Sequence, residues 1–154
     1  MNRVGLFIAT CGYLGHVPVA PGTFGSALGL VVFFAVRSAD STLVELSTII
    51  LLFAVGIWAG TVAERHYGGV DPAPVVLDEV VGMLITLALL PVSATGAIVG
   101  FFVFRVFDVV KPWPSARFER LPGGLGVMAD DGMAGLYGNL AMRGLIAVAP
   151  GWLV

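Results

Sequence analysis

The sequence predicts an all-α protein, a compact bundle of about six helices that is embedded in a membrane or associated with one. Two observations lead to this prediction: the composition and a series of long apolar segments. Apolar residues make up 58% of the 154 residues and charged residues only 12%, whereas an average soluble domain carries about 25% charge. The mean hydropathy is +0.97, so we expect much of the surface to contact lipid. The length fits one domain over residues 1–154.

The first three apolar segments are residues 4–14, 27–36 and 46–63. Their continuity favours helices over strands. Pro21-Gly22 precedes the second segment and Gly68-Gly69 follows the third, which are signals of helix ends. Only the third segment approaches the roughly 20 residues that a helix needs to cross a bilayer. We expect the N-terminus to belong to the fold rather than to a signal peptide, because no small-residue cleavage site precedes a polar region.

The last three apolar segments are residues 80–90, 94–107 and 133–148. The first two are short and are separated by a turn at residues 91–93, so they are predicted to form a hairpin. Lys111-Pro112 and Gly123-Gly124 mark the break before the sixth helix. These lengths support membrane residence without fixing the number of crossings.

Charged residues gather at one end of this bundle. If the helices alternate up and down, the connections at 16–25, 66–77 and 109–129 fall at the same end. That end carries eight of the ten acids: Glu64, Asp71, Asp78, Glu79, Asp108, Glu119, Asp130 and Asp131. It also carries most of the cations, so the positive-inside rule places it in the cytoplasm: Arg65, Arg105, Lys111, Arg117 and Arg120.

Two adjacent acid pairs, Asp78-Glu79 and Asp130-Asp131, stand where polar loops meet apolar helices. Neighbouring carboxylates at such a boundary repel each other and resist desolvation unless something neutralises them. A hard cation such as Mg²⁺ does so, and it prefers oxygen ligands. The alternative for either pair alone is helix capping, because acids are favoured in a first helical turn.

Asp108 closes the helix predicted from the fifth segment, where the helix dipole disfavours an acid. Arg105 and Lys111 lie three residues to either side and share its helical face. Together with the two acid pairs, this misplaced acid predicts a metal site at the charged end. Glu64, beside Arg65, is either a further ligand or a salt-bridge partner.

Residues 21–26 (PGTFGS) introduce the second helix. Glycines let the backbone approach a ligand, and the free amides of a helix start bind anions. Taken alone, Thr23 or Ser26 is more simply a helix cap. Beside a metal site and two cations, the segment becomes a candidate phosphate cradle.

Several other side chains are interpreted as structural. Cys11 is the only cysteine, so it forms no disulfide within the chain and is expected to pack in the core. His16 and His66 lack the flanking residues of a histidine-nucleophile phosphatase, and Asp71 and Glu119 are interpreted as turn and surface residues. A net charge of −2 gives no basic field for nucleic acid. Cysteine-nucleophile, aspartyl-phosphate dehalogenase-type and Walker A motifs are absent from the sequence.

Four blocks of sequence carry a family resemblance: APGTFGS at 20–26, VLDEVVG at 76–82, FRVFDVVKPWP at 104–114 and GGLGVMADDGMAG at 123–135. In type, order and spacing they resemble the phosphatidylglycerophosphatase A family, over nearly the whole chain. The resemblance implies a helical bundle in the bacterial inner (cytoplasmic) membrane. It also implies Mg²⁺-dependent hydrolysis of phosphatidylglycerophosphate to phosphatidylglycerol and phosphate. Leu77 is a mild departure, since a polar or aromatic residue is common there.

The motifs carry the expected site over to particular residues. The catalytic set is Asp78, Glu79, Asp108, Lys111, Asp130 and Asp131. The metal ligands are expected among the same five acids together with Glu64. The residues expected to contact the substrate phosphate are Thr23, Ser26, Arg105 and Lys111.

The expected mechanism is direct attack of water on the phosphorus, with an aspartyl-phosphate intermediate as the mechanistic alternative. The expected partners are the phospholipid substrate and the membrane, and the sequence does not determine the oligomeric state. A divalent-cation carrier or channel is the second functional hypothesis, because acids within membranes often mark ion paths. Clustering of the acids at one end counts against it. A non-catalytic lipid-binding subunit is a third.

Overall fold

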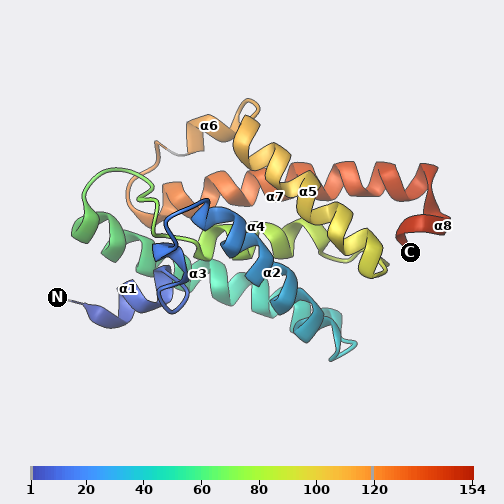
Figure 1. Ribbon diagram of the computed structural model, residues 1–154, viewed down its shortest axis with the longest axis horizontal. Coiled ribbons are helices and arrows are strands. Elements are labelled where there is room, and N and C mark those ends of the chain that lie inside the picture. The colour runs from blue at the N-terminus through green and yellow to red at the C-terminus, as the bar shows by residue number, and fades with distance from the viewer. Residues whose placement is uncertain (1, 119) are drawn as a thin grey trace.

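The computed structural model describes residues 2–118 and 120–154, and within these ranges it contains helices and no strand. The prediction of an all-helical bundle is therefore confirmed. Each of the six predicted segments corresponds to a helix of seven or more residues (Figure 1): α1 (Arg3–Ala9), α2 (Pro21–Arg37), α3 (Thr42–Tyr67), α4 (Leu77–Leu87), α5 (Ala94–Val110) and α7 (Gly124–Val148). Three short helical turns complete the fold: η1 (Leu14–His16), α6 (Ser115–Phe118) and α8 (Pro150–Leu153). Glu119 lies outside the described residues.

Five of the six helices begin before their apolar segments, and α2 and α7 do so by the most residues. α2 starts at Pro21 because proline has no amide hydrogen to satisfy and its fixed φ suits a first helical position. α7 starts at Gly124, so Asp130 and Asp131 lie in its second turn instead of at its start. The capping alternative for this acid pair is therefore wrong.

The first helix is shorter than its apolar segment. α1 ends at Ala9, and the hydroxyl of Thr10 donates a hydrogen bond back to the Leu6 carbonyl at 2.8 Å. The chain then turns through positive φ angles at Cys11 (47°) and Tyr13 (70°). The backbone amide of Val76, just before α4, donates a hydrogen bond to the carbonyl of Ala9, so the end of α1 lies against the start of α4.

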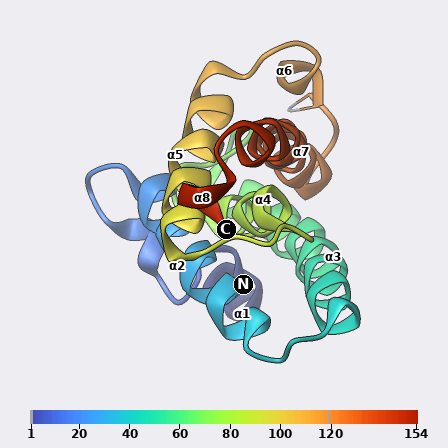
Figure 2. The ribbon, with the colours of Figure 1, turned by 90° about the vertical axis from the view of Figure 1, so that its right-hand side faces the viewer.

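α4 is the central helix, and Figure 2 shows it surrounded by α2, α3, α5 and α7. It packs most extensively against α7 and α2. The approach to α7 depends on two facing glycines: a Cβ on Gly135 would lie 2.6 Å from the carbonyl oxygen of Gly82. Because the two backbones come this close, acids at the start of α4 and in the second turn of α7 are brought together.

The connections divide between the two ends of the bundle as predicted. The loops after α1, α3 and α5 lead toward the left end in Figure 1, whereas the turns after α2 and α4 lie at the right. The three connections that were predicted to carry most of the charged residues therefore lie toward the same end of the folded bundle.

α3 is long and apolar enough, by length and composition, to cross a membrane. Its 26 residues include an 18-residue window with a mean hydropathy of 2.1, of which only 22% is buried in the protein. Large apolar side chains are also exposed on other helices, among them Phe102, Val106, Val109, Leu140 and Val148. Apolar side chains therefore form much of the surface of these helices as well as the core.

Candidate active site

Three acids from two helices converge at the charged end of the bundle. Asp78 and Glu79 lie in the first turn of α4, and Asp131 lies in α7. Each offers a carboxylate oxygen, and these oxygens lie within 4.8 Å of one another. We call these three residues the carboxylate cluster. Asp78 is 4% exposed and Asp131 is 5% exposed, so two of the three charges are removed from solvent.

The carboxylate cluster has unpartnered oxygens. Oδ1 of Asp78, Oε2 of Glu79 and Oδ2 of Asp131 are buried and accept no hydrogen bond from any described residue. Buried polar atoms of proteins are nearly always hydrogen-bonded, since desolvating them without a partner is costly. Three carboxylate groups gathered this closely are the ligands that a hard divalent cation such as Mg²⁺ prefers.

The electrostatics of the carboxylate cluster favour the same conclusion. Burial raises the pKa of Glu79 to about 8, and the negative charge of Asp131 is the next cause. Burial also raises the pKa of Asp78 and of Asp131 well above the usual range, helped by Glu79 and Asp78 respectively. A bound cation would displace protons and stabilise the charged form of all three groups.

Asp108, predicted as a ligand, lies beside the carboxylate cluster and not within it. Its Oδ2 forms an ion pair with Nη1 of Arg105 at 2.5 Å. The same nitrogen donates to the hydroxyl of Ser26 at 3.3 Å, and that hydroxyl donates to the Gly22 carbonyl at 2.9 Å. Asp108 and Ser26 thus hold the guanidinium of Arg105 against the start of α2.

Asp130 is also engaged elsewhere. Its Oδ2 forms an ion pair with Lys111, and its Oδ1 accepts a hydrogen bond from the Ser115 hydroxyl at 2.6 Å. Asp130 is 2% exposed, so this pairing is almost fully buried on the acid's side. A second acid, Asp71, lies 3.9 Å from Lys111. Asp130 therefore fixes the position of a lysine next to the carboxylate cluster.

Residues 21–26, predicted as a phosphate cradle, begin beside the carboxylate cluster. A Cβ on Gly22 would collide with Oε1 of Glu79 and would lie 3.1 Å from Nη1 of Arg105. The first turn of α2 therefore passes directly over an acid of the cluster and a cation, which only glycine permits. Thr23 is half-buried in the same turn, and its amide bonds the Ala20 carbonyl at 3.0 Å.

Glu64 stays apart from the three clustered acids. Its Oε1 is buried and has no hydrogen-bond partner among the described residues, and the residue does not belong to the group that could hold one ion. The interpretation as a salt-bridge partner of Arg65 finds no support, because no such ion pair forms in the described part of the chain.

Sequence reasoning missed three residues near the site. Ser115 follows the PWP segment and carries no signal, because its role depends on where α6 places it against Asp130. Asp71, interpreted as a turn residue, lies near enough to raise the pKa of Glu79. Cys11 is a neighbour of the carboxylate cluster: burial, then the charges of Asp78 and Glu79, raise its pKa to about 12. A thiol with that pKa stays neutral, in agreement with the packing interpretation.

A site that sets three carboxylates beside an arginine, a lysine and a helix start can bind a cation and a phosphate side by side. This is the arrangement used by enzymes that catalyse metal-assisted phosphoryl transfer. Comparison with known proteins agrees: residues 7–146 match the Phosphatidylglycerophosphatase A family, and the chain belongs to it.

Three relatives illustrate the range of the family. A phosphatidylglycerophosphatase A from Escherichia coli is 34% identical over 124 residues, which is 79% of this chain and 72% of the relative. The Haemophilus influenzae enzyme of the same name is 34% identical over 125 residues, covering 80% and 77%. A Bacteroides thetaiotaomicron protein, named as a candidate phosphatidylinositol-3-phosphatase, is 37% identical over 147 residues, covering 91% and 89%. No solved structure matches the chain.

Proposed function

We propose that this protein hydrolyses phosphatidylglycerophosphate to phosphatidylglycerol and phosphate, with Mg²⁺ held by Asp78, Glu79 and Asp131. The observation that carries the proposal is the set of three buried carboxylate oxygens without a partner, in a chain that belongs to this family. When bound, Mg²⁺ would neutralise charge on the phosphate oxygens and make a bound water more acidic.

Two cations are assigned to the substrate phosphate. Arg105 is held by Asp108 and Ser26, so its guanidinium is oriented before the substrate arrives. Lys111 is held by Asp130. Preorganised cations stabilise the charge that develops on the transferring phosphoryl group and cost no reorganisation during the reaction. In this proposal Ser26, Asp108 and Asp130 position the cations instead of binding metal or phosphate.

The start of α2 is assigned to the same phosphate. Its first turn lies over Glu79 and Arg105, and free amides at a helix start bind anions. Thr23 is the side chain of this turn assigned to phosphate contact.

Glu79 is the carboxylate best placed to take a proton from the attacking water. One of its oxygens faces Gly22, at the edge where the phosphate is assigned, while the other is buried among the acids. A phospho-enzyme formed on Asp78 or Asp131 is the alternative, and acid quenching of a reaction with labelled substrate would trap it.

We propose that the protein resides in the bacterial inner membrane with the carboxylate cluster facing the cytoplasm. The apolar sides of α3 and the exposed apolar residues of α5 support membrane residence. The orientation is supported by Arg105, Lys111 and Arg117, which lie on α5, α6 and the loop between them at the charged end. The acyl chains of the substrate would then lie along the apolar bundle while its phosphate reaches the acids.

The decisive experiment measures phosphate release from phosphatidylglycerophosphate in detergent micelles. We expect release that requires Mg²⁺, stops on addition of EDTA and falls at least about 100-fold in Asp131→Asn. Asp40→Asn is the matched control, because this exposed acid lies at the opposite end of the bundle. Release without any metal, or normal turnover in Asp131→Asn, would refute the assignment. Phosphatidylinositol 3-phosphate serves as a second substrate, because one relative bears that activity in its name.

The hypothesis of a divalent-cation carrier or channel gains no support from these comparisons, since the named relatives are phosphatases. Magnesium flux into sealed vesicles, without phosphate release by the purified protein, is the result that would restore it.

A further inference from the structure

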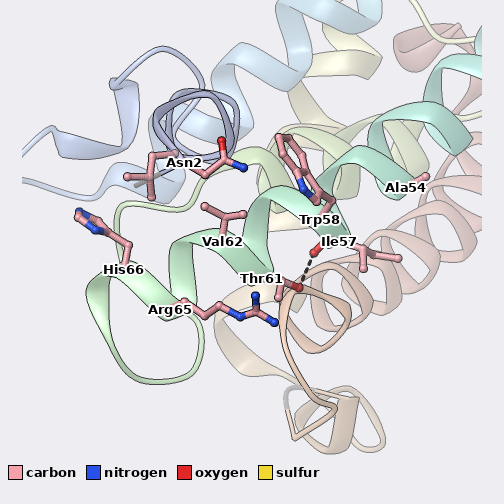
Figure 3. Close-up of a pocket in the computed structure, with 9 residues that line it drawn as sticks. Asn2, Ala54, Ile57, Trp58, Thr61, Val62, Arg65 and His66 are labelled. Atoms are coloured by element: carbon pink, nitrogen blue, oxygen red, sulfur yellow. Dashed lines mark hydrogen bonds between the residues drawn. The ribbon is translucent and has the colours of Figure 1, made fainter.

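A pocket lined by none of the residues of the carboxylate cluster lies between α1 and α3. It has a volume of about 730 Å³, within the range of pockets that bind small molecules and cofactors. Figure 3 shows Trp58 and Val62 on the side of α3 that faces Asn2, with the Arg65 side chain extending beside Thr61.

α3 separates this pocket from the candidate active site. Its inner side carries Ala59 and Ala63, which are fully buried in a core cluster with Val75 and Val127. Ala54, Trp58 and Arg65, which line the pocket, lie on the opposite side of the same helix. Thr61 lies at the edge of the pocket, where its hydroxyl accepts a hydrogen bond from the Gly124 amide of α7 at 2.9 Å. The pocket therefore opens on the side of α3 that is turned away from the core.

The lining divides along the helix into an apolar and a polar part. Ala54, Ile57 and Trp58 form the apolar part, and Thr61, Arg65 and His66 form the polar part near the charged end. Arg65 is exposed and forms no ion pair with any other residue that the structure describes. The two parts extend over 13 residues of helix, from Ala54 to His66, or about 18 Å.

This division identifies the chemistry of the ligand. An arginine without a carboxylate partner suits a phosphate group. Trp58 is 44% exposed, and a tryptophan beside an apolar surface is typical of the membrane interface. A free phosphate would leave the apolar part uncovered, whereas a phospholipid would cover it with an acyl chain. Because the 18-residue apolar window of α3 is mostly exposed, such a lipid could reach the pocket laterally.

We propose that this pocket binds an anionic phospholipid, with the headgroup phosphate at Arg65 and one acyl chain along Trp58 and Ile57. It is a second lipid site, separate from the one where hydrolysis is proposed. A lipid bound here would contact both α1 and α3 and would stabilise the packing of these two helices at the charged end.

The test uses Trp58 as the reporter. Trp113→Phe and Trp152→Phe leave Trp58 as the single tryptophan of the chain, and lipids with brominated acyl chains quench its fluorescence in detergent micelles. We expect brominated phosphatidylglycerol to quench at about fivefold lower mole fraction than brominated phosphatidylcholine, as a charge-assisted contact provides. Equal quenching by the two lipids would overturn the proposal.

Variants of Arg65 sharpen the result. Arg65→Gln should abolish the preference for the anionic lipid, and Arg65→Lys should keep most of it. Arg143→Gln is the matched control, because this exposed arginine of α7 does not line the pocket. A preference that persists in Arg65→Gln, or disappears in Arg143→Gln, would contradict the assignment.

Two further measurements control for non-specific quenching and for lipid bound at the proposed catalytic site. In the single-tryptophan protein that keeps Arg65, unlabelled phosphatidylglycerol should restore the fluorescence quenched by its brominated form, and inorganic phosphate should not. The preference should also persist in Asp131→Asn with EDTA present, where hydrolysis is blocked. Its loss there would show that the lipid binds at the carboxylate cluster and would overturn the separate site, whatever the enzyme does with its substrate.

Discussion

Replacing Glu79 with glutamine tests the electrostatics of the carboxylate cluster directly. Burial and the charge of Asp131 raise the pKa of Glu79 from 4.5 to about 8. A raised acid pKa means that the folded state holds the proton more tightly than the unfolded state. The resulting stabilisation is fully present below pH 4.5 and is lost as the pH rises to about 8.

The magnitude follows from the same shift. Each pH unit between 4.5 and 7 removes about 1.4 kcal/mol, so the loss at neutral pH is on the order of 3 kcal/mol. Without divalent cations, the free energy of unfolding should therefore fall steeply between pH 5 and 8. The glutamine in Glu79→Gln cannot ionise. The free energy of unfolding of this variant should therefore fall by on the order of 3 kcal/mol less between pH 4.5 and 7. Asp78 and Asp131, whose pKa values are also raised, leave part of the slope in place.

Mg²⁺ should act in the opposite direction, because it competes with the protons. At a concentration 100 times its dissociation constant a ligand adds about 2.7 kcal/mol, which for a chain of this length is a rise in Tm of roughly 5–10 °C. We expect that rise at pH 8 and little of it at pH 5. Thermal unfolding in detergent, followed by intrinsic fluorescence at both pH values, measures it.

Two outcomes would refute this reasoning. One is a pH dependence of unfolding in Glu79→Gln that parallels the original protein. The other is an equal effect of Mg²⁺ on Tm at pH 5 and pH 8. Asp40→Asn, at the opposite end of the bundle, should behave like the original protein in both respects and controls for the loss of one negative charge.

Three substitutions test the supports of the site. Ser115→Ala removes a hydrogen bond to buried Asp130 and should cost about 1–3 kcal/mol of unfolding free energy, with a higher KM; unchanged stability would exclude the contact. Gly22→Ala places a methyl group on the Glu79 carboxylate and should lower phosphate release at least about tenfold with helix content by circular dichroism unchanged. Gly135→Ala crowds the backbone of α4 and should cost about 1–3 kcal/mol; a Tm as high as that of the original protein would contradict the close helix contact.

The sequence predicted the helices well because their signals are local. Apolar runs and glycine or proline breaks are properties of neighbouring residues, and each of the six segments contains a helix. The helix ends were less predictable. Pro21 and Gly124 begin helices although they look like breaks, since proline suits a first turn and tertiary packing overrides the low helix propensity of glycine.

The candidate site was predicted as a group of acids at one end, without the distinction between their roles. Asp108 and Asp130 are as acidic in the sequence as Asp78 and Asp131, yet each has its own cation. No local sequence pattern distinguishes an acid that forms an ion pair with a cation from an acid that packs against other acids. Ser115 shows the same limit, because a lone serine gains its role only from the residue opposite.

The sequence by itself determined the helical class, the apolar surface and the end of the bundle where the acids collect, because composition and periodicity act along the chain. Tertiary structure alone decided which acids share one space. The close approach of α4 and α7 at Gly82 and Gly135 brings Asp131 to Asp78 and Glu79. The turn of α5 brings Lys111 to Asp130. Contacts across helices are set by packing of the whole bundle, so the pairing of charges could be obtained only from the fold.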